Sequence, residues 1–278
     1  MIDEIIELAF KEDLGDGDHS SLSCVPEEAQ GKAKLLVKDN GILAGVEFAQ
    51  QLFHYYDPEL KVNIYKKDGE YVKFGDIAFE VEGASRSILA TERLILNFMQ
   101  RMSGIATLTH EIVQLIQGTD AKLLDTRKTT PGIRALEKWA VRIGGGHNHR
   151  MGLYDMIMLK DNHIDYAGGI ENAIRRANQY RKDRKLAIKI EIEVRDENEL
   201  KQVLALPEVD RIMLDNFTPE QIKKVIHSIP SHIETEASGG ITKENIRAYA
   251  ETGINFISSG ALTHSVKSLD LSLKAVYL

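Results

Sequence analysis

Cationic side chains in glycine-rich or strand-end positions are the most specific chemical feature of this 278-residue chain. Arginine binds carboxylates and phosphates through two parallel hydrogen bonds, and lysine adds a point charge. Between residues 122 and 163, eight Lys and Arg residues stand against four acids, although the whole chain has a formal charge of −7. This contrast predicts a small anionic ligand and argues against a protein that coats nucleic acid or a membrane. The group comprises Arg127, Lys128, His149, Arg150 and Lys160.

Two patterns near this group have plainer explanations. Arg134, Lys138 and Arg142 recur at helical spacing, and we expect them to form a solvated helix face. His147 and His149 are spaced as a metal-binding pair, but the sequence offers no third ligand of matching softness. A zinc site is therefore disfavoured.

Two glycine-containing segments indicate a phosphate site. In Ser238-Gly239-Gly240 the glycines let backbone N–H groups approach an anion, and we expect Thr242 to cap a helix whose positive end faces the same way. Ser259-Gly260-Ala261 repeats the pattern one strand later. The alternative is that these glycines merely end strands. Two such segments on successive strands favour the phosphate site common at the top of β/α barrels.

Glu193 and Asp215 are paired carboxylates at consecutive predicted strand ends. Magnesium binds through one or two carboxylates together with substrate phosphates, so this pair beside a phosphate site predicts Mg²⁺. The alternative is that one of them forms a structural ion pair with Lys189 or Arg195.

From residue 120 onward, short apolar runs alternate with amphipathic segments, which predicts a parallel sheet with helical crossovers. The reactive residues fall where these runs end, as at the top of a barrel. Because about 160 residues are few for eight strands, the α/β fold class takes the form of an irregular β/α barrel with fewer than eight strands. The predicted strands are 121–125, 155–159, 186–193, 210–214, 232–237 and 254–258, and the predicted helices lie near 132–142, 168–183, 196–206, 218–228 and 242–251.

The first part of the chain mixes strands and helices without a regular alternation, which predicts an N-terminal α+β, sandwich-like domain. A long helical stretch, 86–117, follows and is expected to break near Ser103-Gly104. We therefore predict an N-terminal domain over 1–105 with its connecting helix and a catalytic barrel domain over 106–278, whose last residues pack back on the first domain.

Composition narrows the class of protein. The chain is 43% hydrophobic and holds one cysteine, Cys24, so an internal disulfide and a cysteine-based zinc site are excluded. An acidic N-terminus and the lack of a long apolar run predict no signal peptide and no membrane span. We expect a cytoplasmic protein, and neither Cys24 nor a Gly-x-Ser-x-Gly elbow supports nucleophilic catalysis.

An ordered set of motifs closely resembles the nicotinate-nucleotide pyrophosphorylase family, the quinolinate phosphoribosyltransferases. The resemblance extends over essentially the whole chain and includes Glu92-Arg93 with Asn97. The stretch between Glu193 and Asp215 is one residue longer than is usual in the family, near Pro207, which leaves open whether Glu191 or Glu193 faces the site. The motifs are Asp125-Thr-Arg-Lys-Thr-Thr-Pro-Gly132, Gly144-Gly-Gly-His-Asn-His-Arg-Met-Gly-Leu153, Ile157-Met-Leu-Lys-Asp-Asn-His163, Ile190-Glu-Ile-Glu193, Met213-Leu-Asp-Asn-Phe217 and Glu236-Ala-Ser-Gly-Gly-Ile241.

The resemblance implies a pentosyltransferase. Such an enzyme converts quinolinate and phosphoribosyl pyrophosphate into nicotinate mononucleotide, pyrophosphate and CO2 in NAD biosynthesis. It further implies that Arg93, Arg127, His149, Arg150 and Lys160 hold quinolinate, and that Lys160, Glu193 and Asp215 are catalytic. For phosphoribosyl pyrophosphate and its Mg²⁺, the implied residues are Thr126, Lys128, Glu193, Asp215, Ser238, Gly239, Gly240, Ser259, Gly260 and Ala261.

By the same resemblance, the protein is a homodimer or a higher homo-oligomer with shared active sites, in which Arg93 reaches the quinolinate pocket of a second subunit. On the surrounding helix we expect Leu89, Leu96 and Met99 to be buried, with Arg93 on another face.

Three other functions compete with this interpretation. A related phosphoribosyltransferase acting on another base would not need the full cationic set. A non-enzymatic anion-binding module would not need Glu193 and Asp215. A barrel aldolase would use Lys160 as a Schiff base, but that chemistry needs a desolvated lysine, and Lys160 has ionic neighbours.

Overall fold

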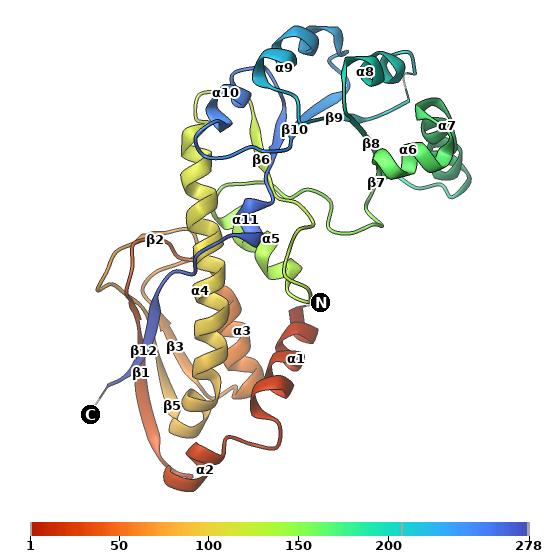
Figure 1. Cartoon of the computed structure of the whole chain (residues 1–278). Helices are drawn as coiled ribbons and strands as arrows, with labels where there is room; N and C mark the ends of the chain where they lie inside the picture. The colour runs from red at the N-terminus through yellow and green to blue at the C-terminus, as the bar shows by residue number, and fades with distance from the viewer. Residues whose placement is uncertain (1, 207, 277–278) are drawn as a thin grey trace. The chain divides into compact units, whose positions relative to one another are not determined.

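The computed structural model describes residues 2–206 and 208–276, which form two compact units (Figure 1). The first unit comprises residues 2–110, 129–145 and 261–276, and the second comprises 111–128 with the described part of 146–260. The predicted domain boundary at 105 lies inside one helix, α4 (Ser85–Leu115). Among the described helices, none is both long and apolar enough to cross a membrane.

A four-stranded antiparallel sheet in the order β12-β1-β5-β3 builds the first unit. Leu35 and Val37 of β1 are fully buried, because alternate side chains of a strand point to the same face. The last strand, β12, pairs with β1 and sets Leu273 opposite Leu35. Phe53 packs edge-on against Phe79 with ring centres 5.8 Å apart. The strands are β1 (Gln30–Val37), β3 (Lys61–Ile64), β5 (Ile77–Ala84) and β12 (Leu271–Ala275).

Helix α4 runs unbroken for 31 residues, so the predicted break near Ser103-Gly104 is wrong. Gly104 instead allows the backbone at Lys267 to approach the helix closely, since a Cβ there would overlap the backbone oxygen of Lys267. Met99 is fully buried as expected, but Leu89 is 44% exposed and does not belong to the buried face.

Helix α5 (Arg134–Ile143) corrects a second expectation. Lys138 is fully buried, so Arg134, Lys138 and Arg142 do not form one solvated face. Helical spacing aligns three side chains along a helix, but it does not reveal whether other parts of the chain cover the middle one. Glu137, next to Lys138, is also buried and accepts hydrogen bonds from Arg101 at 2.8 and 3.1 Å.

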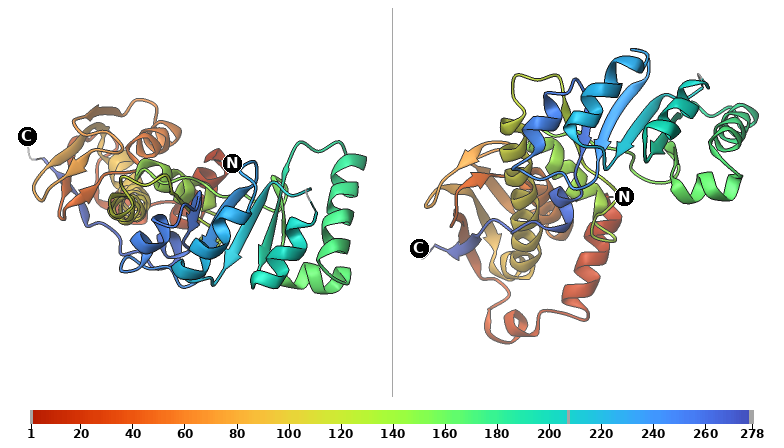
Figure 2. Two further views of the ribbon diagram at one scale, coloured as in Figure 1. Left: turned by 90° about the horizontal axis from the view of Figure 1, so that it is seen from above. Right: turned by 45° about the horizontal axis from the view of Figure 1, so that its top comes forward.

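The second unit is built on a parallel sheet of six strands in the order β6-β11-β10-β9-β8-β7, seen in two further views in Figure 2. The predicted α/β class and the count of fewer than eight strands are confirmed. Among the described residues no ladder joins β6 to β7, so the sheet does not close into a complete barrel. The strands are β6 (Lys122–Leu124), β7 (Met156–Leu159), β8 (Lys189–Val194), β9 (Arg211–Asp215), β10 (Glu234–Ser238) and β11 (Phe256–Ser258).

Helices follow most of these strands as expected, and several pack against the sheet. Helix α7 contacts β7, α8 contacts β8, and α10 contacts β11. Their bounds are α7 (Ile170–Asp183), α8 (Glu197–Leu204), α9 (Pro219–Val225), the 3-10 turn η1 (Ile226–Ser228) and α10 (Ile246–Ala250). The remaining elements are α1 (Ile2–Leu14), α2 (His19–Cys24), β2 (Gly41–Ile42), α3 (Val46–Tyr56), β4 (Tyr71–Val72), α6 (Asp161–Ala167) and α11 (Ala261–His264).

Candidate active site

One face of the second sheet is unusually polar for the interior of a β/α unit. Successive residues of a strand point to opposite faces, so on β8 the buried Ile190, Ile192 and Val194 share one face and charged residues share the other. We call this second face the polar face. On β8, β9 and β10 it carries Lys189, Glu191, Glu193, Arg211, Met213, Asp215, Glu234, Glu236 and Ser238.

Lys160 and Glu193 meet where β7 and β8 end. The Lys160 Nζ lies 3.6 Å from the Glu193 Oε2, and their side chains are 48% and 12% exposed. Burial raises the pKa of Glu193, the Lys160 charge opposes this effect, and the nearby Asp215 charge adds to it. The structure therefore brings together the three residues predicted to be catalytic.

The alternative pairing of Glu193 or Asp215 with Lys189 or Arg195 is wrong. Lys189 Nζ lies 2.7 Å from Glu234, and Arg195 lies 2.5 Å from Glu199. Both cations therefore have partners away from the predicted catalytic pair.

Asp215 is oriented by its neighbours. Its carboxylate accepts hydrogen bonds from the Ser238 hydroxyl at 2.7 Å and from the Asn216 side-chain amide at 2.6 Å. Gly239 has a φ of +88°, and a Cβ there would overlap the Asn216 side chain, so a glycine is required. Gly240 has a φ of +62° and open space beside it. Close packing thus explains Gly239, and the positive φ explains Gly240.

The helix predicted at Thr242 begins later. Helix α10 starts at Ile246 with Asn245 as its N-cap residue, and residues 243–245 form a turn. Thr242 therefore does not cap this helix, and the five-residue helix does not provide the expected positive end. The side chain of Asn245 accepts the Thr242 amide hydrogen at 2.8 Å instead.

The segment that carries His149 is held against the end of β6. His147 forms a parallel bridge to Leu124, and the carboxylate of buried Asp125 accepts the His149 amide hydrogen at 2.8 Å and the Asn148 side-chain amide at 2.5 Å. Asp125 is thus a structural residue that fixes where His149 and the following Arg150 lie.

Arg150 is buried close to Arg127. Burial lowers the pKa of Arg150 and the charge of Arg127 lowers it further, while the charges of Glu191 and Asp155 oppose this effect, so two guanidinium groups repel each other within a mixed set of charges. The Arg150 Nη1 donates to the Met156 carbonyl at 3.3 Å. A bound anion would relieve this repulsion, and a ligand with two carboxylates suits two arginines.

The other predicted binding residues occupy several places. The Thr126 hydroxyl accepts the Lys128 amide hydrogen at 3.0 Å beyond β6. Ser259 is buried, and its amide donates a hydrogen bond to the Leu124 carbonyl at 3.0 Å. This bond holds the backbone that leads into Gly260 in place. Arg93 and Ala261 belong to the first unit, where Arg93 is exposed on α4 and Ala261 begins α11.

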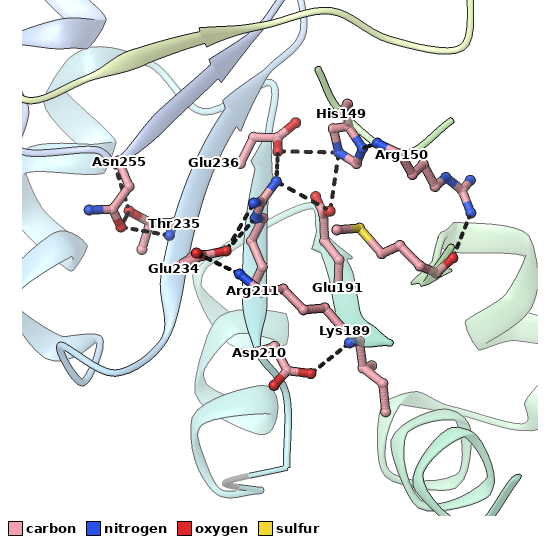
Figure 3. Close-up of polar contacts among 12 residues, drawn as sticks. His149, Arg150, Lys189, Glu191, Asp210, Arg211, Glu234, Thr235, Glu236 and Asn255 are labelled. Carbon is pink, nitrogen blue, oxygen red and sulfur yellow. Dashed lines mark hydrogen bonds and ion pairs between the residues drawn. The ribbon is translucent and has the colours of Figure 1, made fainter. Parts of the chain in front are cut away.

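The sequence analysis did not identify the buried charge cluster formed by His149, Glu191, Arg211 and Glu236 (Figure 3). His149 Nε2 lies 3.1 Å from the Glu191 Oε2 and 3.3 Å from the Glu236 Oε2. Burial alone lowers the pKa of His149, but these two carboxylates raise it to about 9. Burial raises the pKa of Glu191, whereas the hydrogen bond from His149 keeps the pKa of Glu236 low despite burial.

Both Glu191 and Glu193 lie on the polar face, which answers the question left open by their spacing. Glu191 is fully buried in the cluster, and Glu193 lies nearer the end of β8 beside Lys160. Pro207, where the extra residue was placed, lies outside the described residues.

His149, Glu191 and Glu236 offer ligand atoms within 4.8 Å of one another, which is the geometry of a small metal site. Arg211 already occupies the space between the carboxylates, with its Nη1 3.0 Å from the Glu236 Oε2. Because a guanidinium supplies the positive charge that the two carboxylates need, we interpret the group as an ion-pair network.

Comparison with known proteins identifies the family. The description "Quinolinate phosphoribosyl transferase, C-terminal domain" matches residues 105–274, and the corresponding N-terminal domain matches residues 18–103. The chain belongs to the quinolinate phosphoribosyltransferase family. Among relatives of this family, the chloroplastic nicotinate-nucleotide pyrophosphorylase (carboxylating) of Arabidopsis thaliana is 46% identical over 97% of this chain and 81% of that protein.

Two further members of the quinolinate phosphoribosyltransferase family support this assignment. A mitochondrial quinolinate phosphoribosyltransferase (decarboxylating) of Nicotiana tabacum is 44% identical over 98% of this chain and 81% of that protein. The crystal structure of NadC from Streptococcus pyogenes is 40% identical and superposes with a TM-score of 0.93, covering 100% of this chain and 97% of that one. The similarity thus includes both sequence and fold over the whole chain.

Proposed function

We propose that this protein transfers the ribosyl 5-phosphate of phosphoribosyl pyrophosphate to the ring nitrogen of quinolinate. The products are nicotinate mononucleotide, pyrophosphate and CO2, and the step belongs to NAD biosynthesis. The observation that carries the proposal is the pair of mutually repelling arginines, Arg127 and Arg150, beside the end of a sheet that bears Lys160, Glu193 and Asp215. Quinolinate has two carboxylates, and this cationic pair matches them.

For the quinolinate half of the site we propose Arg127, His149, Arg150 and Lys160. His149 is held by Asp125 through its backbone and by two carboxylates through its ring, so a ligand would meet an already oriented imidazole. Lys160 is the more exposed member of its ion pair with Glu193, so its side chain can turn toward a bound carboxylate.

For the phosphoribosyl pyrophosphate half we propose Thr126 and Lys128, the carboxylates Glu193 and Asp215, and the segments 238–240 and 259–261. The positive φ at both Gly239 and Gly240 marks a tight backbone turn after β10, which supports a role in holding the 5-phosphate. The charge of Asp215 raises the pKa of Glu193, so the two carboxylates lie close enough to repel each other. This hard-oxygen donor pair fits Mg²⁺, which would neutralise the pyrophosphate and so assist its departure.

The transfer needs electrostatics and alignment more than covalent chemistry. As the bond to pyrophosphate breaks, positive charge develops on the ribose ring, and carboxylates at the sheet end stabilise that charge. The arginine pair and His149 hold quinolinate so that its ring nitrogen faces the reacting carbon. No side chain has to act as a nucleophile.

We further propose a homodimer in which Arg93 completes the partner's quinolinate site. The support is an exposed stripe on α4, where Leu89, Arg93 and Asn97 follow one another at helical spacing and are all exposed. Arginine is enriched in protein–protein interfaces relative to the rest of the surface. Assembly beyond a dimer and the cytoplasmic location stay predictions.

The proposed function is tested by incubating the protein with phosphoribosyl pyrophosphate, Mg²⁺ and either quinolinate or nicotinate. We expect nicotinate mononucleotide from quinolinate, with a rate at least about a hundredfold lower from nicotinate, because nicotinate lacks one of the two carboxylates that the cationic group is proposed to bind. A faster reaction with nicotinate would favour the related phosphoribosyltransferase. In a separate incubation with a small aldehyde or ketone, a covalent adduct trapped on Lys160 by borohydride would favour the aldolase.

A further inference from the structure

Arg211 is a buried cation that contacts three carboxylates on the polar face (Figure 3). Its guanidinium donates to the Glu234 Oε2 at 2.9 and 3.1 Å and to the Glu236 Oε2 at 3.0 Å, and it lies 3.9 Å from the Glu191 Oε2. The ring of Phe256 covers it at 4.2 Å, a cation–π contact, and Arg211 is only 6% exposed. Packing and hydrogen bonds therefore fix this guanidinium in one position.

The same two carboxylates hold the ring of His149. Glu191 and Glu236 each have an oxygen next to the His149 Nε2 and a contact with Arg211. Arg211 and His149 thus share two buried carboxylates, and Arg211 supplies a permanent positive charge to both. Without Arg211, the carboxylates next to His149 would lose this positive charge, and they would repel an anion bound at His149.

We propose that Arg211 is a positioning residue that sets the charge and orientation of His149 in the quinolinate site. It does so through Glu191 and Glu236, without touching the substrate. This inference rests on the proposed function, because it assumes that His149 faces quinolinate. It predicts an effect on the binding of one substrate, whereas a purely structural role would reduce the fraction of folded enzyme and leave the KM values unchanged.

The test compares three variants by steady-state kinetics, after circular dichroism and thermal unfolding have confirmed folding. Arg211→Met removes the charge. Arg211→Lys keeps the charge but cannot reproduce the forked contacts. The control, Lys189→Met, removes the neighbouring polar-face cation, which pairs with Glu234 and is about half exposed.

We expect Arg211→Met to raise the KM for quinolinate about tenfold, which corresponds to the loss of one charge-assisted contact. The KM for phosphoribosyl pyrophosphate should rise less than about twofold. Arg211→Lys should lie between wild type and Arg211→Met, and Lys189→Met should leave both KM values within about twofold of wild type.

A double variant keeps the test decisive if Arg211→Met folds poorly. Adding Glu236→Gln to Arg211→Met removes one negative charge and so compensates for the lost positive charge. The double variant should therefore have a quinolinate KM at least about threefold lower than that of Arg211→Met. If the single variant does not fold, the quinolinate KM of the double variant should lie within about threefold of wild type. Equal changes in both KM values, or a quinolinate KM that the double variant worsens further, would overturn the inference. A wild-type enzyme that makes no nicotinate mononucleotide would instead refute the proposed function.

Discussion

His149 and Glu191 face each other inside the second unit, with the imidazole Nε2 3.1 Å from the carboxylate and both side chains buried. The Arg150 amide donates a hydrogen bond to Nδ1 of the same ring at 2.7 Å. Nδ1 can accept this bond only while it carries no proton, so the ring loses the contact when it becomes positively charged. Burial disfavours the charged ring, but the hydrogen bonds and charges of Glu191 and Glu236 raise the pKa of His149 to about 9.

The first prediction is a pH dependence of stability that arises from His149. Its folded-state pKa is raised from 6.5 to about 9, so its contribution is fully present below the unfolded pKa and is lost as the pH rises toward and through 9. Urea unfolding of wild type and His149→Gln at about pH 6 and pH 9.5 should show a stability difference that shrinks at the higher pH. A difference that is the same at both pH values would show that folding leaves the pKa of His149 unchanged, and a difference that grows at the higher pH would show that the ring is neutral in the folded protein.

The second prediction concerns Arg150. Arg150→Ala should weaken quinolinate binding by about 1.5–3 kcal/mol, the value of a hydrogen bond to a charged group. The same change should lower the free energy of unfolding by less than about 1 kcal/mol, because it also removes the repulsion from Arg127 and the cost of burying a charge. Calorimetric titration with quinolinate and urea unfolding measure the two quantities.

A matched control for Arg150 is Arg175→Ala. Arg175 is exposed on α7 and pairs with Glu171 at 2.9 Å, so its loss should change neither quantity by more than about 0.5 kcal/mol. Unchanged quinolinate affinity in Arg150→Ala would remove Arg150 from the binding site.

The third prediction is a requirement for a divalent cation. Activity should disappear in excess chelator and return with Mg²⁺, because Glu193 and Asp215 are carboxylates at neighbouring strand ends beside the proposed phosphate loops. Asp215→Asn should raise the KM for phosphoribosyl pyrophosphate more than that for quinolinate. Full activity after exhaustive chelation would contradict the proposed metal site.

The fourth prediction tests the shared site. Arg93→Ala and Lys160→Ala should each be inactive alone, but a mixture under conditions of subunit exchange should regain activity, since some heterodimers collect both lesions in one site and leave the other intact. Mass spectrometry of differently labelled subunits verifies the exchange. Verified exchange without recovered activity would show that Arg93 does not serve a partner's site.

Much of the second unit could be predicted from sequence, because short apolar runs that alternate with amphipathic segments predict parallel strands joined by helices. The predicted strands 210–214 and 232–237 agree with β9 and β10 within two residues at either end. The residues at the strand ends, such as Asp215, could be placed near one another because parallel strands end on the same side of a sheet.

The buried charges could not be predicted, because local patterns indicate which face a residue takes but not what covers that face. Glu191 and Arg211 alternate with apolar residues, a pattern typical of a half-exposed strand, yet both are buried by contacts distant in sequence. The sequence signal for the buried cluster was the alternation of charged and apolar residues in Lys189–Val194. Gly104 was similarly ambiguous, because a glycine in a helix indicates either a break or a close approach.

The most direct test of the central claim measures CO2 and nicotinate mononucleotide in the same reaction. Quinolinate labelled in the carboxylate that is lost is incubated with the enzyme, Mg²⁺ and phosphoribosyl pyrophosphate, and released label and nucleotide are quantified over time. The account predicts equal amounts of the two products, both dependent on phosphoribosyl pyrophosphate and both reduced at least about tenfold at low quinolinate in Arg150→Ala. Binding of quinolinate without either product, or nucleotide formed without release of CO2, would contradict it.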